Sequence, residues 1–427
     1  MIAAGISLDI ARELRAICGD DNARERPAGG VYVSPASAEE VAAVLRLANS
    51  HQLSVTPAGG STEHSAAASR TDIVLHLNRL TQVEHYDHAD LTVGVGAGTT
   101  IARLNAMVGA DKLMFAGDPP LPERCTVGGL LATASHGPLR HGYGGVRDYC
   151  IGVRFVTGDG RRGKGGGRVV KNVAGYDLMK LLIGSYGTLA VITSASFKLF
   201  PAPRQTRTFL AEFGTAKEAL EFRDRVMRSP LSPMCLELVS PGARKLMRPE
   251  MTQDAWVMCV RAAGSDAVLA RYRKELGSAV TREIAGDGER KMWKAIGNFP
   301  LTADTESENS ALQECRQRIH FHVQIRDVLR VIEDLNENAA NSNLDVGIIG
   351  RVGVGHVLAV DLPPTGKIRW PAGVDVEAPG GSFGIDVRPK VEWTANPWPI
   401  APSHLASMRA VKHALDPKNV LQGREIF

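Results

Sequence analysis

The sequence of 427 residues has no C-x-x-C spacing among its cysteines. Iron–sulfur clusters, zinc ribbons and the disulfide frameworks of small secreted proteins all need closely spaced cysteines. The sequence therefore excludes these classes of site, and we expect reduced thiols in a cytoplasmic protein. The six cysteines are Cys18, Cys125, Cys150, Cys235, Cys259 and Cys315.

Long apolar runs are missing as well. No run approaches the ~20 residues that a helix needs to cross a bilayer. The N-terminus shows no basic region ahead of an apolar core, which is the pattern of a secretory leader. We therefore expect any association with a membrane to be peripheral, at its inner face and through partner subunits.

The chain also lacks a strong net charge of either sign. The chain has 50 Lys and Arg against 46 Asp and Glu, a formal net charge of +4. The basic residues are scattered rather than gathered on one element, so the composition gives no argument for a nucleic-acid partner. We expect no nucleic acid to bind.

The chain is long enough for two or three domains, each with its own core. Strands, helices and glycine loops alternate in the first half, which is the order of an α/β domain. Pro201 and Pro203 end this pattern, and antiparallel strand pairs with helices follow. The expected regions are an accessory helix at 1–25, a first domain at 26–205, an α+β domain at 206–395, and a C-terminal helix and tail at 396–427.

The first glycine-rich segment is 57–62, Pro-Ala-Gly-Gly-Ser-Thr, after an expected strand at 53–57. Its glycines allow close approach, and the N–H groups of Gly59 to Thr62 could form a nest for a diphosphate. A plain turn is the alternative interpretation, since such junctions commonly use Gly and Ser.

The second segment is 125–137, with Thr126, the pair Gly128 and Gly129, and small residues as far as Gly137. Small residues leave main-chain N–H groups uncovered, so a flat ligand that carries phosphates can lie against the backbone. A helix packed tightly on a sheet is the alternative. His136 either presses on such a ligand or is an ordinary loop histidine.

The third segment is 184–192, where Gly-Ser-Tyr-Gly-Thr-Leu turns directly into an apolar strand. Small residues again occur where backbone must approach something closely. In contrast, Gly158 to Lys164 fits only part of a phosphate-binding loop, because no Ser or Thr follows the lysine. We interpret 158–165 as a flexible hairpin tip, with Val169 and Val170 in the returning strand.

The order of the three segments resembles the FAD-binding domain of the vanillyl-alcohol oxidase (PCMH-type) flavoproteins, over roughly the first half of the chain. The resemblance implies an α+β fold, in which a two-lobed PCMH-type domain of α/β subdomains precedes an α+β antiparallel-sheet cap domain. It implies FAD as cofactor, bound by Pro57, Gly59, Gly60, Ser61, Thr62, Asp118, Pro119, Thr126, Gly128, Gly129, Ala132, Ser135, His136, Gly137, Tyr143, Gly187, Thr188 and Ile192. Relatives with covalent flavin use a histidine near the position of Thr62, so non-covalent FAD is expected.

The stretch from Arg168 to Asp177 is similar to the E subunits of bacterial glycolate oxidases. This resemblance implies a FAD-binding subunit that takes part in oxidation of a 2-hydroxy acid, glycolate to glyoxylate. It also implies two partners, a homologous catalytic flavoprotein and an iron–sulfur subunit. The alternatives are a self-sufficient FAD-dependent D-2-hydroxy-acid dehydrogenase and a structural subunit with a degenerate flavin site.

Oxidation of a 2-hydroxy acid requires a base for the hydroxyl proton and a cation for the carboxylate. His356 is the candidate base, although it also fits an ordinary strand residue. Arg351, Arg388 and Lys390 are the candidate cations. Related dehydrogenases place paired histidines and a carboxylate around a metal in the second domain, but here no second histidine closely follows His356, so no metal site is expected.

Overall fold

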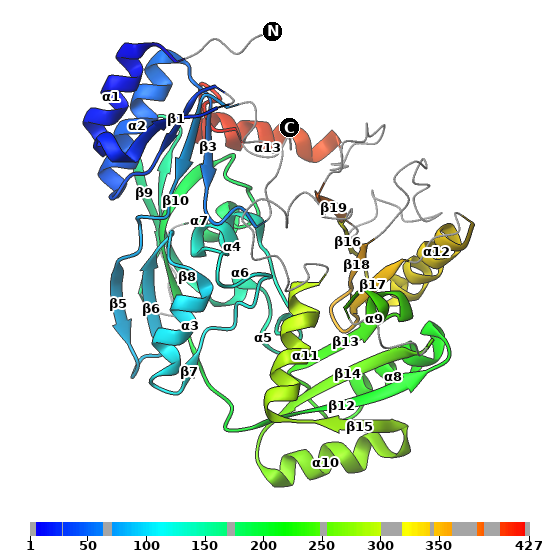
Figure 1. The fold of residues 1–427 in the computed structure, drawn as a ribbon. Coiled ribbons are helices and arrows are strands. Elements are labelled where there is room, and N and C mark those ends of the chain that lie inside the picture. The colour runs from blue at the N-terminus through cyan, green and yellow to red at the C-terminus, as the bar shows by residue number, and fades with distance from the viewer. Residues whose placement is uncertain are drawn as a thin grey trace. The chain divides into compact units, whose positions relative to one another are not determined.

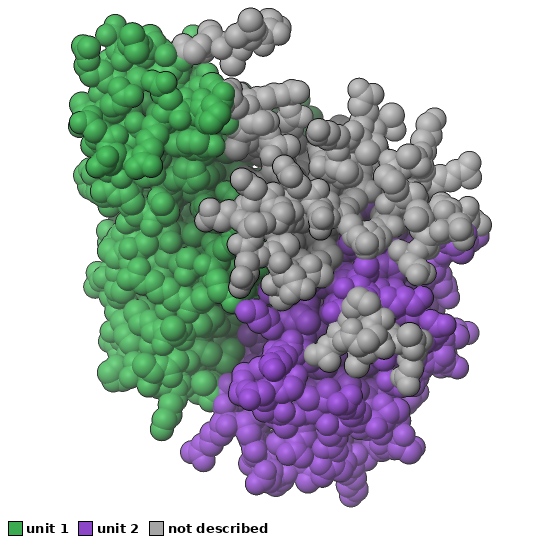
Figure 2. Space-filling view, viewed as in Figure 1, with its two compact units in different colours: residues 1–136, 144–202, 402–427 green, residues 137–143, 203–401 purple. Residues whose placement is uncertain are grey.

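The computed structural model describes residues 6–27, 29–62, 71–168, 176–247, 254–299, 318–341, 346–360, 382–387 and 402–422. The chain forms two compact units, which Figures 1 and 2 show. Unit 1 comprises 1–136, 144–202 and 402–427, and unit 2 comprises 137–143 and 203–401. The C-terminal helix, which the sequence set apart, belongs to unit 1.

The N-terminal part of unit 1 is a four-stranded sheet in the order β1-β2-β4-β3, in which β2, β4 and β3 run parallel. Helix α2 begins where the Ser37 hydroxyl accepts a hydrogen bond from the N–H of Glu40 (3.1 Å) and ends at Gln52 in the left-handed region. The elements are α1 (Leu8–Cys18), β1 (Ala23–Glu25), β2 (Val31–Val33), α2 (Ala38–His51), β3 (Val55–Ala58) and β4 (Ile73–His76).

The second sheet of unit 1 is antiparallel throughout, in the order β5-β6-β10-β8-β9. One of its faces buries an aromatic core, in which the rings of Phe115 and Phe197 lie 4.8 Å apart. The elements are β5 (Val83–Asp87), β6 (Thr92–Gly96), α3 (Ile101–Gly109), β7 (Leu113–Met114), α4 (Val127–Thr133), α6 (Val146–Tyr149), β8 (Cys150–Thr157), β9 (Arg162–Gly166), α7 (Leu178–Leu182), β10 (Ala190–Lys198) and β11 (Phe200–Pro201).

Strand β9 corrects the expectation of a flexible tip at 158–165. The chain turns at 158–161 and returns at once, with Lys164 opposite Arg154 on β8. Gly163 lies against the ring of Phe155, where a Cβ would stand only 2.5 Å from a ring carbon. A glycine-rich sequence therefore serves here as a strand that makes room for an aromatic side chain. Val169 and Val170 lie outside the described residues.

Unit 2 is built on one antiparallel sheet of eight strands in the order β15-β12-β14-β13-β17-β18-β16-β19. Its elements are α5 (Arg140–Tyr143), β12 (Thr206–Phe213), α8 (Ala216–Arg228), β13 (Cys235–Val239), α9 (Pro241–Met247), β14 (Trp256–Ala263), α10 (Asp266–Leu276), β15 (Val280–Ile284), α11 (Gly286–Asn298), β16 (Arg318–His322), α12 (Val328–Asn341), β17 (Gly347–Arg351), β18 (His356–Val360) and β19 (Ser382–Val387). The expected α+β cap domain with antiparallel strands is confirmed.

The two faces of this sheet differ in chemistry. Leu236, Leu238 and Met258 face helices α8, α10 and α12 and form the hydrophobic core with them. Because side chains alternate along a strand, Glu237 and Cys259 point to the opposite face. This second face carries the ionisable side chains described below.

All five cysteines in the described part of the chain are free and buried. Burial, with the charge of Glu237 as a second cause, raises the pKa of Cys259 to about 12, so its thiol stays protonated. No helix in the described ranges combines the length and the apolar composition that crossing a membrane would require.

Candidate functional site

A cavity of about 230 Å³, here called cavity 1, opens in unit 1 where the three glycine-rich segments meet. Its lining includes expected cofactor residues from each segment: Pro57, Gly59, Gly60, Ser61, Thr62, Thr126, Gly128, Gly129, Ala132, Gly187 and Ile192. It also includes residues that the sequence analysis did not select: Tyr32, Thr56, Ala58, Val74, His76, Leu77, Thr133, Tyr186 and Ala190.

The remaining expected cofactor residues are not part of this lining. They are Asp118, Pro119, Ser135, His136, Gly137, Tyr143 and Thr188. Gly137 and Tyr143 belong to the short segment that is counted with unit 2, and His136 is the last residue before it. The carbonyl of Thr188 accepts a hydrogen bond from Lys412 on α13 (Pro402–Leu415).

Two glycines bring the segments into direct contact. A Cβ on Gly59 would lie 2.2 Å from Oγ1 of Thr126, and a Cβ on Gly187 would lie 3.3 Å from Cγ of Pro57. The first segment thus packs against both of the others, and a side chain at Gly59 would force them apart. The glycines are needed for this close approach of backbone.

Main-chain hydrogen bonds fix the third segment to α4. The N–H of Gly184 donates to the carbonyl of Leu131 (2.9 Å), and the N–H of Tyr186 donates to that of Ala132 (2.8 Å). Tyr186 and Gly187 both adopt positive φ, 52° and 75°. A non-glycine residue rarely adopts such a φ, so Tyr186 holds a strained turn on the cavity wall.

The main-chain donors that line cavity 1 come from 57–62 rather than from α4. The N–H of Gly128 already donates to the carbonyl of Ala97 (2.8 Å), and that of Gly129 donates to the hydroxyl of Thr126 (3.2 Å). No described residue accepts a hydrogen bond from the N–H groups of Gly59 to Thr62. They remain available to a ligand, as the nest interpretation requires.

Buried polar atoms in cavity 1 fit a polar ligand. Thr56 is 1% exposed, and its hydroxyl forms no hydrogen bond with the residues that the structure describes. A buried hydroxyl without a partner costs free energy, so a bound group that supplies one would be stabilised. Burial, assisted by the charge of Arg26, lowers the pKa of His76, whose ring lies 5.4 Å from that of Tyr32. The two rings therefore offer a neutral aromatic surface at the cavity.

A second group of polar side chains lies on the ionisable face of the sheet in unit 2. Arg351 and His356 pair across β17 and β18, with Nη1 and Nδ1 2.8 Å apart. Nε2 of His356 lies 2.8 Å from Nδ1 of His320 on β16. The sequence analysis expected His356 to stand alone, and it missed His320 because strand pairing brings the two together across 36 residues.

The arginine fixes the tautomer of His356. A guanidinium only donates, so Nδ1 of His356 must accept and its proton must be on Nε2. Nε2–H then donates to Nδ1 of His320. Both ring nitrogens of His356 are therefore engaged in hydrogen bonds, so this residue cannot accept a proton from a substrate. His320 is the more exposed histidine of the two, since it is half-buried while His356 is buried.

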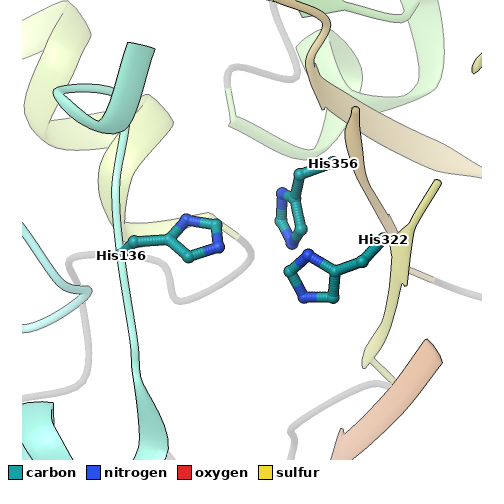
Figure 3. Close-up of side chains that lie close together, drawn as sticks. All are labelled: His136, His322 and His356. Atoms are coloured by element: carbon teal, nitrogen blue, oxygen red, sulfur yellow. The ribbon is translucent and has the colours of Figure 1, made fainter. Parts of the chain in front are cut away.

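The guanidinium of Arg351 is likewise engaged with neighbouring side chains. Its side chain is 3% exposed and lies 3.8 Å from the carboxylate of Glu237, which is fully buried. This geometry favours a role in orienting His356 over direct binding of a substrate carboxylate. The ring of His322 also lies beside that of His356, 4.7 Å between centroids, as Figure 3 shows. Arg388 and Lys390 lie outside the described residues.

Comparison with known proteins gives a family model described as an FAD binding domain, which matches residues 30–164. D-lactate dehydrogenase of Archaeoglobus fulgidus is 38% identical over 232 residues, covering 53% of this chain and 51% of that protein. Glycolate oxidase subunit GlcD of Bacillus subtilis is 25% identical over 386 residues, covering 82% and 80%. Glycolate oxidase subunit GlcE of Escherichia coli is 36% identical over 155 residues, covering 36% and 44%. The match thus spans about half the length of two of these three relatives.

Among solved structures, an alkyldihydroxyacetonephosphate synthase matches with a TM-score of 0.71 at 15% identity, covering 100% of this chain and 87% of that one. A p-cresol methylhydroxylase matches with a TM-score of 0.66 at 14% identity, covering 83% and 84%. These likenesses show the fold, while the family model confirms FAD as the cofactor of the domain. The chain therefore contains an FAD-binding domain, matched over residues 30–164, and it is homologous to glycolate oxidase subunits and D-lactate dehydrogenases.

Proposed function

We propose that this chain binds FAD non-covalently in cavity 1 and works as the FAD-binding subunit of a glycolate oxidase complex. The observation that carries the proposal is the meeting of the three glycine-rich segments around one cavity. In the complex a 2-hydroxy acid, glycolate in the first instance, is oxidised to a 2-oxo acid. The carbon that bears the hydroxyl loses a hydride, the hydroxyl loses a proton, and two electrons leave through an iron–sulfur partner.

Each part of the cavity has a distinct task in binding. The free N–H groups of Gly59 to Thr62 would hold the diphosphate, and the buried hydroxyl of Thr56 would supply a further hydrogen bond. Gly129 and Gly187 keep the walls bare, so that a flat ring system can lie against backbone. FAD, when bound, supplies a hydride acceptor. Thr62 is no nucleophile for a flavin ring, which accords with non-covalent binding.

The need for a partner follows from the electron count. A reduced flavin must pass on two electrons before the next turnover. The cysteine spacings offer no ligand set for an iron–sulfur cluster. GlcD and GlcE are named as subunits of glycolate oxidase, and both are homologous to this chain. We therefore propose a homologous flavoprotein and an iron–sulfur protein as partners.

A second candidate is a self-sufficient D-2-hydroxy-acid dehydrogenase. The ordered series Arg351, His356 and His320 favours it, because each hydrogen bond fixes the tautomer of the next histidine. In this case His320, whose Nδ1 accepts from His356, would carry its proton on Nε2 and would donate a hydrogen bond from there to an oxygen of the substrate. A third candidate, a structural subunit with a degenerate flavin site, would bind FAD weakly or not at all.

Anaerobic reduction separates the first two candidates. The purified chain, loaded with FAD, is mixed with glycolate or D-lactate while flavin absorbance is followed, first alone and then with the two co-expressed partners. We expect negligible bleaching by the chain alone and rapid bleaching in the complex. Bleaching by the chain alone at an ordinary turnover, about 1 to 1,000 per second, would contradict the subunit assignment and support the dehydrogenase. In that event His320→Gln should slow the bleaching.

A further inference from the structure

A buried lysine on α13 joins the last described residues to the rest of unit 1. The side chain of Lys412, on α13, is 11% exposed. Its Nζ donates to the carbonyl of Thr188 (2.7 Å), to the carboxylate of Asp416 (2.6 Å) and to the carbonyl of Leu421 (2.9 Å). All three protons of the ammonium group are therefore used, and one of them reaches the loop that carries Gly187.

Asp416 organises the other side of the same junction. Its carboxylate accepts hydrogen bonds from the N–H groups of Val420 (2.9 Å) and Leu421 (2.8 Å). The residue is 1% exposed. This carboxylate shapes the turn after α13, and its charge offsets that of Lys412 in a buried position.

The turn then joins the first wall of cavity 1. The N–H of Val55 donates to the carbonyl of Val420 (2.8 Å), and the N–H of Gln422 donates to the carbonyl of Val55 (2.8 Å). Val55 begins β3, which runs into Pro57 and the free N–H groups of 59–62. The described residues near the C-terminus thus bond to the strand that leads into the first segment, at Val55, and to the third segment, at Thr188.

We propose that Lys412, Asp416, Val420, Leu421 and Gln422 form a C-terminal brace that sets the spacing of the two walls of the flavin cavity. Lys412 is then a positioning residue for FAD, and FAD binding and docking of the brace stabilise each other. The inference rests on the proposed FAD site. According to this inference, residues 412–422 affect the affinity for FAD although they are far in sequence from the glycine-rich segments.

The contacts explain why the coupling should be strong. Pro57 lies so near Gly187 that an added Cβ would stand 3.3 Å from its ring, so the two walls have little room to move independently when the brace holds both. Loss of the bond from Lys412 frees the Thr188 carbonyl and relaxes the strained turn at Tyr186. A ligand that needs the ordered walls must then supply the ordering free energy itself, which appears as weaker binding. Coupling of this kind is reciprocal, so FAD should also protect the brace.

Lys412→Met tests the proposal, with Lys418→Met as the matched control. Lys418 is an exposed lysine of the same segment, and its Nζ bonds only to the carbonyl of Asn49 (3.1 Å) among the described residues. The Kd for FAD is measured by quenching of flavin fluorescence. We expect Lys412→Met to raise Kd at least about tenfold, since the bond that it removes from the Thr188 carbonyl is a buried hydrogen bond from a charged donor. The control should change Kd less than about twofold.

A second measurement tests the proposal without any variant, in case Lys412→Met does not fold. Hydrogen exchange of the N–H groups of Leu421 and Gln422 is followed in the unaltered chain with and without FAD. We expect saturating FAD to slow it at least about tenfold, matching the effect of Lys412→Met on Kd. Gln422→Pro, which removes the N–H bonded to Val55 without exposing a charge, should also weaken FAD binding.

The outcomes separate the brace from the proposed function. If the unaltered chain binds no FAD, the FAD site itself is wrong. If it binds FAD while folded Lys412→Met binds it equally well, the brace is wrong and the FAD site stands. Exchange at Leu421 and Gln422 that does not respond to FAD would overturn the brace in the same way.

Discussion

Gly129→Glu is expected to raise the Kd for FAD about a hundredfold while the protein stays folded. Gly129 lines cavity 1, and the nearest atom to an added Cβ is Oγ1 of Thr126 at 3.3 Å. The same Oγ1 is the nearest atom to an added Cβ on Gly59, in the segment that would hold the diphosphate, so a carboxylate at 129 would repel the phosphates. Two like charges about 5 Å apart cost about 3 kcal/mol at an effective dielectric constant of about 20. That free energy corresponds to a hundredfold or more in Kd.

The helix itself should tolerate the change. Position 129 is the third residue of α4, whose cap is Thr126, and glutamate is favoured at that position of a capping box. Gly109→Glu is the matched control, because Gly109 is an exposed glycine at the end of α3 with nothing within 4 Å of an added Cβ. Flavin fluorescence gives Kd for both variants. Equal Kd values for Gly129→Glu and Gly109→Glu would refute the placement of FAD in cavity 1.

Arg351→Met should destabilise unit 2 by about 3–5 kcal/mol, because it removes a buried positive charge that lies 3.8 Å from the buried carboxylate of Glu237. It also removes the donor to Nδ1 of His356. Unit 1 contains cavity 1, so FAD should remain bound. Urea denaturation followed by tryptophan fluorescence should report the loss through Trp256 and Trp293, which lie in unit 2.

The double variant Arg351→Met with Glu237→Leu shows whether the ion pair is the cause. It replaces both charges with apolar groups of similar size, so we expect more than half of the lost stability to return. If the double variant is no more stable than Arg351→Met alone, the destabilisation comes from lost packing or from His356, and the assigned role of Glu237 is wrong.

Local signals in the sequence predicted much of the fold. Thr100 caps α3 and Ser37 caps α2 because their hydroxyls accept from N–H groups three residues on, a relation visible in the sequence. The apolar, β-branched composition of Cys150–Thr157 is likewise that of a buried strand, and β8 is found there. The three glycine-rich segments were selected because short polar turns next to strands signal backbone that approaches something closely.

Contacts between distant residues explain what the sequence did not predict. Helix α11 was not expected, although its Glu289 accepts buried hydrogen bonds from Thr206 (2.7 Å) and Thr208 (2.8 Å) on β12. Both bonds exist only after the sheet has formed. His320 was overlooked for the same reason, since its partner is 36 residues away in the sequence. Nothing in the local sequence distinguishes Lys412 from an exposed lysine, because its partners Thr188 and Leu421 come to it only through the fold.

The most direct test of the account is the amount of flavin that the purified chain holds and how it is released. The chain is incubated with excess FAD, passed through a desalting column, and measured by its visible spectrum before and after precipitation with acid. The account predicts about one FAD per chain, found entirely in the acid supernatant. Less than about a tenth of an equivalent at saturating FAD, or flavin that stays in the protein pellet, would contradict it.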